Sequence, residues 1–366
     1  MQSAIVILRE VRDPRDVNSR HDAGTILFLA LVATLCGAKS CVDIAEFVEA
    51  NEEELCKIVD LPHGPPSHDT FSRLFRLLDP AELAKVFTAF MTALRQALGL
   101  GLPRGVVAID GKSLRRGYEK GHPHLPPLMV SVWDAETRVA VAQARAPGGN
   151  EIGATLELLR GLVLKGCTVT ADALHCHPAM AKEVLAAKAH YALGLKGNHG
   201  PLYAEAERLF AAAGVDAPSF VTEERAHGRI ERRRASVLPA SVAARALLPG
   251  LKALGCIEAE RTGTDGKREI TRRYIALSRL LRPAKLLEVV RAHWGIENQL
   301  HWTLDVVFDE DDARTRKDYA PENLGVIRRL AQNILRLHPS AGSISRKMRR
   351  AMWSKEYLYE LFAHLR

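Results

Sequence analysis

The sequence predicts an α/β fold preceded by an all-helical region, and three observations lead to this prediction. Residues 1–100 carry apolar side chains at helical spacing, without the alternation that marks a half-buried strand. From residue 104 onward, apolar segments of strand length are followed by helix-like segments. A strand-rich stretch at about 217–278 then separates this pattern from a helical C-terminus. With 366 residues, 47% of them hydrophobic, the chain is long enough for two or three domains.

Residues 1–100 are expected to form a helical domain of the kind that binds DNA or a protein partner. The apolar run from Thr25 to Ala38 is too short to span a bilayer, so it indicates a buried core helix. Ser67 can cap the helix that follows it, and Pro80 suits the first position of the next one. No leader peptide is recognised and the six cysteines lack CxxC spacing, so we expect a cytoplasmic protein with reduced thiols.

The next region has its elements in the order of a ribonuclease-H-like domain: three strands, a helix, a strand, a helix, a strand and a helix. A doubly wound nucleotide-binding fold is the alternative, but AIDGKSLRRG lacks the Gly-rich turn that this fold requires. We therefore expect a ribonuclease-H-like domain at residues 104–340, with a β-rich insertion at about 217–278 before its last helix. Residues 341–366 are expected to form a basic helical tail.

Positive charge is concentrated at the C-terminus. Residues 314–366 contain 12 Lys or Arg against four Asp or Glu, which accounts for the whole formal net charge of +8. Such an asymmetry is the electrostatic pattern expected of a protein that binds nucleic acid. A solvated helix face that binds nothing is the alternative.

Three carboxylates occupy positions that suit a shared site. Asp110 ends the first predicted strand, Asp172 follows the fourth, and Glu297 lies in the helix-like segment HWGIENQLHW. In a ribonuclease-H-like sheet the first and fourth strands are neighbours, so Asp110 and Asp172 would meet at adjacent strand ends. Glu297 would join them from a helix packed across the sheet. Taken singly, each aspartate is better explained as a turn or helix-capping residue, which is the usual role of an aspartate at a strand end.

A metal site follows from this grouping. Clustered carboxylates repel one another unless a cation neutralises them, and oxygen ligands suit Mg²⁺ or Mn²⁺. Two such ions roughly 3.5–4 Å apart form a known clamp for phosphodiester chemistry. Glu297 could instead face solvent, but its neighbours at helical spacing, His293, Trp294, Leu300 and His301, would then make an unusually aromatic exposed surface.

The segments VVAIDGK, VTADALHCH and RAHWGIENQLHWTLDVVFDEDDARTR resemble the DDE transposases of bacterial insertion sequences, in the branch that includes the H-repeat-associated proteins. The resemblance extends over essentially the whole chain. It implies that Asp110, Asp172 and Glu297 are the catalytic triad, with Asp110 shared by two Mg²⁺ or Mn²⁺ ions. It also implies a nucleoid-associated homodimer that binds the inverted-repeat ends of an element and target DNA, and that acts as endonuclease and strand transferase.

The DNA-contacting residues are less well defined than the triad. Related transposases carry a Tyr-x-x-Arg-x-x-x-Glu-x6-Lys signature. In this sequence only Glu297 matches it, because Val290, His293 and Leu304 stand in the places of the Tyr, the Arg and the Lys. Tryptophans are expected in the core, except Trp294. The side chains expected to contact DNA are Lys112, Arg115, Arg116, Lys196, Asn198, Arg229, Arg233, Arg291, His293, Trp294, His301, Arg314, Arg316, Arg328 and Arg329.

Two other functions fit the same residues. One is a domesticated, non-mobile DNA-binding descendant of a transposase. An intact carboxylate triad argues against lost chemistry, whereas terminal inverted repeats in the flanking DNA would decide mobility. The other is a metal-dependent nuclease that cuts DNA without joining it. Only analysis of the reaction products separates that nuclease from a transposase.

Overall fold

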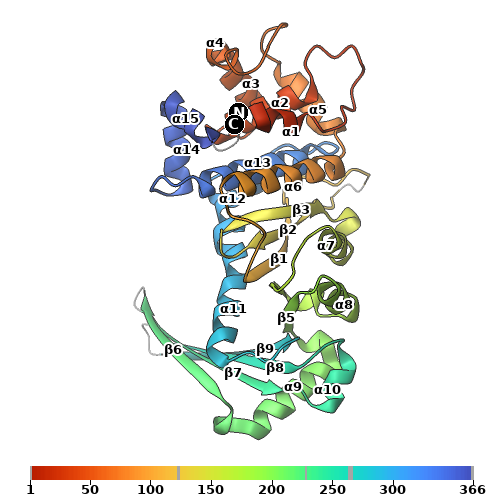
Figure 1. The fold of residues 1–366 in the computed structure, drawn as a ribbon, viewed down its shortest axis with the longest axis vertical. Helices are drawn as coiled ribbons and strands as arrows, with labels where there is room; N and C mark the ends of the chain where they lie inside the picture. Colours follow the sequence, from red (N-terminus) through yellow and green to blue (C-terminus); the bar gives the residue numbers. More distant parts are fainter. Residues whose placement is uncertain (1, 122–123, 227–228, 263–266, 364–366) are drawn as a thin grey trace. The chain divides into compact units, whose positions relative to one another are not determined.

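The computed structural model describes residues 2–121, 124–226, 229–262 and 267–363 (Figure 1). The chain forms two compact units that interleave along the sequence. The first comprises Met1–Leu102, Gly111–Leu158 and Glu297–Arg366, and the second comprises Pro103–Asp110 and Leu159–Ile296.

The N-terminal part of the first unit is helical, as predicted. Its helices are α1 (Gln2–Leu8), α2 (Ala23–Leu35), α3 (Cys41–Ala50), α4 (Glu52–Leu55), α5 (His68–Leu77) and α6 (Pro80–Ala97). Every residue of α2 is buried, which confirms the predicted core helix. Ser67 caps α5 and Pro80 opens α6, also as predicted. Among the described residues, no helix is both long and apolar enough to cross a membrane.

The C-terminal part of the first unit completes the same core. It contains η5 (Ile296–His301), α12 (Trp302–Val306), η6 (Glu310–Asp312), α13 (Ala320–Leu337), α14 (Ile344–Trp353) and α15 (Lys355–Leu361). Helix α13 is buried from Ala320 to Leu335 and packs against α2, α5, α6 and the strand β3 (Val139–Arg145). Asn333 on α13 exchanges hydrogen bonds with the main chain of Ala140 in β3, at 2.7 and 3.1 Å.

A buried carboxylate on α13 makes the stability of this unit depend on pH. Burial raises the pKa of Glu322 to about 7, and Arg145, whose Nε lies 3.7 Å away, opposes the shift only in part. The contribution of Glu322 to the free energy of unfolding is therefore fully present below its unfolded-state pKa of 4.5, and it is lost as the pH rises through about 7. At 1.36 kcal/mol per unit, the loss amounts to at most about 3 kcal/mol.

We expect Glu322→Gln to remove this loss, because a glutamine has no proton to release. Urea unfolding at pH 5, 6, 7 and 8 measures the effect, with Glu82→Gln on α6, whose side chain is 37% exposed, as the matched control. The free energies of unfolding of wild type and Glu322→Gln should diverge progressively from pH 5 to pH 7 and differ by a constant amount at higher pH. Parallel profiles would show that Glu322 is not buried as a carboxyl group.

The strands form one mixed sheet in the order β3-β2-β1-β4-β5-β9-β8-β7-β6. The hairpin of β2 (Leu128–Asp134) and β3 is antiparallel, whereas β1 (Val106–Ser113), β4 (Thr168–Ala171) and β5 (His190–Leu195) pair in parallel. The strands expected at residues 104–195 are thus present. The helices α7 (Glu151–Arg160), α8 (Pro178–Ala186) and α9 (Gly200–Ala213) alternate with them, also as expected.

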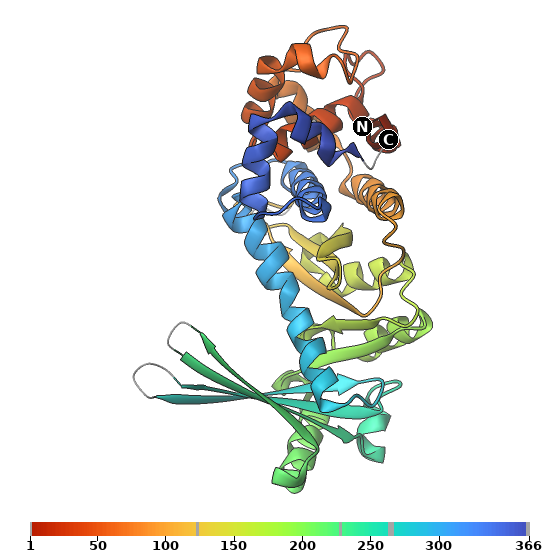
Figure 2. The same cartoon turned by 60° about the vertical axis from the view of Figure 1, so that its left-hand side comes forward.

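Strands also occupy the predicted insertion, with one addition. They are β6 (Ser219–Ala226), β7 (Arg229–Pro239), β8 (Ala253–Thr262) and β9 (Arg268–Leu277), all paired antiparallel. The short helix α10 (Val242–Leu247) between β7 and β8 was not predicted. Helix α11 (Pro283–Gly295) crosses these strands (Figure 2), and Gly255 leaves it room, since a Cβ there would lie 2.6 Å from Leu286.

Candidate active site

The second unit contains two of the predicted triad residues, on or next to paired strands. Strand β1 runs parallel to β4 with Val106 opposite Thr168 and Ala108 opposite Thr170. If the same register continued for two more residues, Asp110 would lie beside Asp172, and this meeting remains a prediction. Asp172 is exposed just past the end of β4, whereas Asp110 is half-buried inside β1, which continues to Ser113 and so corrects the strand end predicted at Asp110.

Local packing fixes the position of Asp172. Its Oδ1 accepts a hydrogen bond of 2.9 Å from the amide of Leu174 and so caps the short turn η2 (Ala173–His175). Strand β5 approaches this turn closely at Gly194, where a Cβ would lie 3.3 Å from the amide nitrogen of Ala173. Capping was the alternative explanation for this aspartate, and the cap is present. The capping hydrogen bond uses one carboxylate oxygen of Asp172, so the other oxygen could still bind a metal ion.

A histidine from α11 lies against the same strand. Thr170 in β4 and His293 share a hydrogen bond of 3.0 Å between Oγ1 and Nδ1. Burial lowers the pKa of His293 to about 4, although the charge of Asp172 acts in the opposite direction. The imidazole is therefore neutral at pH 7. It occupies the place of the signature arginine, but without a positive charge.

Glu297 lies in the first unit, on a different kind of helix from the one predicted. The segment η5 is π-helical, a form with i→i+5 hydrogen bonding that is frequent at functional sites. Ile296 and Leu300 are fully buried and anchor this turn, whereas Glu297 is exposed. The wider turn separates Glu297 from Leu300, which corrects the α-helical spacing assumed for them. The meeting of Glu297 with the two aspartates remains a prediction.

An ion-pair network surrounds Lys112 in the first unit. Its Nζ lies 2.6 Å from Asp305 and 2.8 Å from Asp311, and Asp311 also pairs with Arg115. Lys112 is buried, so these carboxylates satisfy its charge internally. His301 lies near this network. Burial lowers its pKa to about 3, and nearby cations, Arg329 first, lower it further.

Other residues expected to contact DNA are exposed or half-buried, and most have partners within the protein. Arg233 and Arg291 both pair with Glu224 on β6, and the guanidinium of Arg273 lies 4.5 Å from the ring centre of Trp294. Arg229 begins β7, but its side chain is outside the described residues. The rest of this accessible set comprises Arg115, Arg116, Lys196, Asn198, Arg314 and Arg316.

Two expected DNA contacts, Arg328 and Arg329 on α13, need correction. Arg329 is fully buried and donates to Glu310 at 2.9 and 3.4 Å, while Arg328 lies 3.9 Å from the same carboxylate. Guanidinium groups held in this way stabilise the interior and do not reach a phosphate. Arg328, Arg329 and the buried Lys112 are therefore removed from the set of residues expected to contact DNA.

The prediction that the tryptophans other than Trp294 lie in the core is wrong in part, because Trp302 is 57% and Trp353 is 72% exposed.

The donor set suits a hard divalent cation in kind, because Asp110, Asp172 and Glu297 offer oxygen ligands at accessible positions. Within the parts of the chain that the structure describes, no group of three His, Cys, Asp or Glu side chains is arranged to hold a metal ion. Thr170 and Gly194 were not singled out from sequence. Their signal was weak: Thr170 precedes Asp172 by two residues in its strand, and Gly194 interrupts an apolar strand.

Comparisons with known proteins agree with this arrangement. Residues 5–91 match the family model described as DDE_Tnp_1-associated, and residues 101–334 match the model described as Transposase DDE domain. A relative from Escherichia coli O157:H7, "Putative transposase YncI", is 31% identical over 98% of this chain and 93% of its own length. A second, "H repeat-associated putative transposase YhhI" of E. coli K12, is 32% identical over 94% of this chain and 93% of its own length. The chain belongs to the DDE transposase family.

Proposed function

We propose that the protein is the transposase of a bacterial insertion sequence, and that it binds the element ends and catalyses metal-dependent DNA cleavage and strand transfer. The parallel pairing of β1 with β4 carries this proposal, because Asp110 lies in β1 and Asp172 directly follows β4 in a member of this family. Strand order β3-β2-β1-β4-β5 supports a ribonuclease-H-like topology for the catalytic domain. Glu297 is the third carboxylate of the triad.

Two Mg²⁺ or Mn²⁺ ions would be held by Asp110, Asp172 and Glu297, with Asp110 shared between them. When bound, such ions stabilise the charge that develops on a transferred phosphate and lower the pKa of the attacking hydroxyl. The neutral His293 and its partner Thr170 position strand β4, and with it Asp172, against α11. No covalent intermediate with the protein is required.

The first unit would supply much of the surface that holds DNA. Contacts from its exposed cations position a duplex without reading its sequence, because they reach phosphates and not base edges. A homodimer would pair the two element ends. The exposed cations of the C-terminal region are Arg314, Arg316, Lys317, Arg346, Arg349, Arg350 and Lys355.

The reaction products test this function. Purified protein is incubated with a supercoiled plasmid that carries the element and its flanking DNA, with Mg²⁺, Mn²⁺ or EDTA. We expect cleavage at the element ends and joined strand-transfer products, both only with a metal ion. Cleavage without joined products would instead identify a nuclease. Binding to the ends without cleavage would identify a domesticated DNA-binding protein.

A further inference from the structure

A polar cavity of about 390 Å³ lies in the helical part of the first unit. It opens between the connection from α1 to α2 and the start of α5. Its wall includes Arg15, Arg20, His21, His63, Thr70 and Arg73. The volume falls at the small end of the roughly 300–1,000 Å³ typical of ligand sites, which is enough for a nucleotide unit.

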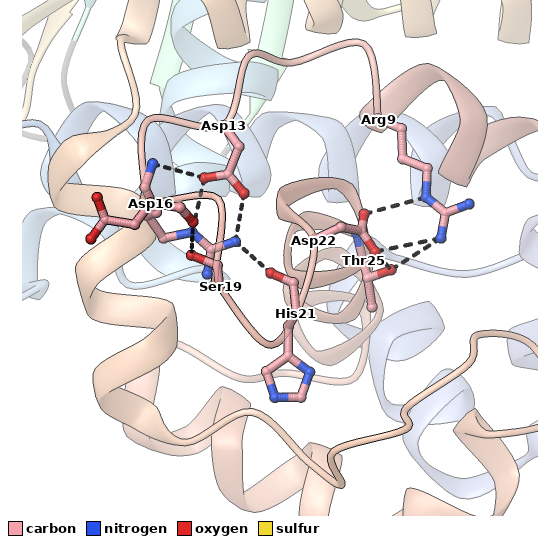
Figure 3. Close-up of polar contacts among 8 residues, drawn as sticks. Arg9, Asp13, Asp16, Ser19, His21, Asp22 and Thr25 are labelled. Carbon is pink, nitrogen blue, oxygen red and sulfur yellow. Dashed lines mark hydrogen bonds and ion pairs between the residues drawn. The ribbon is translucent and has the colours of Figure 1, made fainter.

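The wall is held in place before any ligand arrives. Arg15 donates to both oxygens of Asp13, at 2.9 and 2.7 Å, and to the carbonyl of His21 at 2.6 Å (Figure 3). Its side chain is only 5% exposed. Farther along, Asp22 accepts from Arg9 and from the amide of Thr25, which fastens the connection to the start of α2. A guanidinium anchored in this way loses little conformational entropy when it binds an anion.

Positive charge in the wall exceeds negative charge. Arg15, Arg20 and Arg73 face a single lining carboxylate, that of Asp16, with Asp13 paired behind Arg15. The contact between Arg73 and Asp16 is long, at 3.9 Å, and both side chains are exposed, so it holds Arg73 only weakly. Arg20 is exposed. Two guanidinium groups are thus available to a ligand beside the anchored one.

The two imidazoles add further donors. The rings of His21 and His63 meet edge to face, with centroids 6.1 Å apart. Burial lowers the pKa of His21, and the charges of His63, Arg15 and Arg20 lower it further. A negative ligand in the cavity would relieve this crowding of positive groups and favour proton uptake by the imidazole.

We propose that this cavity binds a phosphate group of DNA, gripped by Arg20 and Arg73 against the fixed guanidinium of Arg15. Guanidinium forks match phosphate oxygens in geometry as well as in charge. The proposal rests on the proposed function for the choice of DNA over a free nucleotide, because both offer the same phosphate chemistry. It assigns a DNA contact to a cavity whose lining residues lie outside the basic C-terminal stretch of the sequence.

The test compares Arg20→Ala/Arg73→Ala with a control that also loses two cations of the first unit, Arg12→Ala/Lys85→Ala. Arg12 lies on the same connection and Lys85 on α6, and neither lines the cavity. Fluorescence anisotropy of an element-end duplex, without metal ions, gives the DNA affinity at several salt concentrations. Deoxyadenosine monophosphate serves as the competing free nucleotide.

We expect roughly tenfold weaker DNA binding by the cavity variant than by the control, with a slope of log K against log salt lower by roughly 1. Matching thermal unfolding midpoints exclude misfolding. Equal affinity and slope in the two variants would overturn the proposal. The proposal would also be overturned if the cavity variant lost affinity for deoxyadenosine monophosphate but kept its affinity for the duplex, since that result would identify a free nucleotide as the ligand. Because no cleavage is measured, failure here leaves the catalytic proposal untouched.

Discussion

Replacing Glu297 with glutamine is expected to lower metal-dependent cleavage of element ends by at least roughly 10²–10³-fold, the cost of losing one electrostatic group at a reacting phosphate. The amide keeps the size of the side chain but lacks the charge that a divalent ion requires. Glu297 is exposed, while the buried Ile296 and Leu300 hold its turn, so the fold should persist. DNA affinity without metal should equal that of wild type.

Glu288→Gln is the matched control for this experiment. Glu288 is exposed on α11 and pairs with Lys285, so the control removes one carboxylate from the same stretch of helix. Initial cleavage rates with Mg²⁺ and anisotropy in EDTA are measured for all three proteins. If Glu297→Gln cuts as fast as Glu288→Gln, Glu297 is not a metal ligand. If both variants lose DNA binding, their lower cleavage rates reflect misfolding and not the loss of a metal ligand.

Glu310→Ala is expected to lower the free energy of unfolding by about 3–5 kcal/mol, the usual cost of leaving a buried charge without its partner. Arg329 is fully buried and its two hydrogen bonds to a side chain both go to Glu310. Arg328, also buried, lies 3.9 Å from the same carboxylate. Removing Glu310 therefore leaves two guanidinium groups without their counter-ion in the core of the first unit.

Urea unfolding measures this effect. Glu82→Ala on α6 breaks the exposed pair with Lys85 and should cost at most about 1 kcal/mol. A double variant, Glu310→Leu/Arg329→Met, should recover part of the loss because it removes a buried charge together with its partner. A cost below 1 kcal/mol for Glu310→Ala would mean that water reaches Arg329.

The sequence was sufficient to predict that β1 and β4, the strands associated with Asp110 and Asp172, are neighbours, because the order of elements along the chain indicates the strand order of the sheet. It was not sufficient for Glu297, since nothing in the local composition distinguishes a π-helical turn from an α-helical one. Arg328 and Arg329 were misassigned for a different reason. A count of charges does not reveal burial, and their partner Glu310 lies outside α13, 19 residues before Arg329.

The cavity at Arg15, Arg20 and Arg73 could not be predicted from sequence either. Its wall joins two stretches that are separated by α2, α3 and α4, and each stretch alone reads as an ordinary polar loop. Helix boundaries were easier, because Ser67 and Pro80 act on their immediate neighbours. Local signals thus fixed the elements, whereas the sites depend on contacts between distant segments.

The interleaving of the two units has a consequence for synthesis. Helix α2, buried along its whole length, packs against α13, which leaves the ribosome almost 300 residues later. Until then the nascent chain leaves uncovered the face of α2 that α13 later buries, although α1, α3 and α5 already pack against the helix, and an exposed apolar face is prone to aggregation. The second unit lies between these segments and can fold first. Complete translation is therefore a condition for a stable first unit, so fragments that end before Ala320 would be targets for chaperones and proteases.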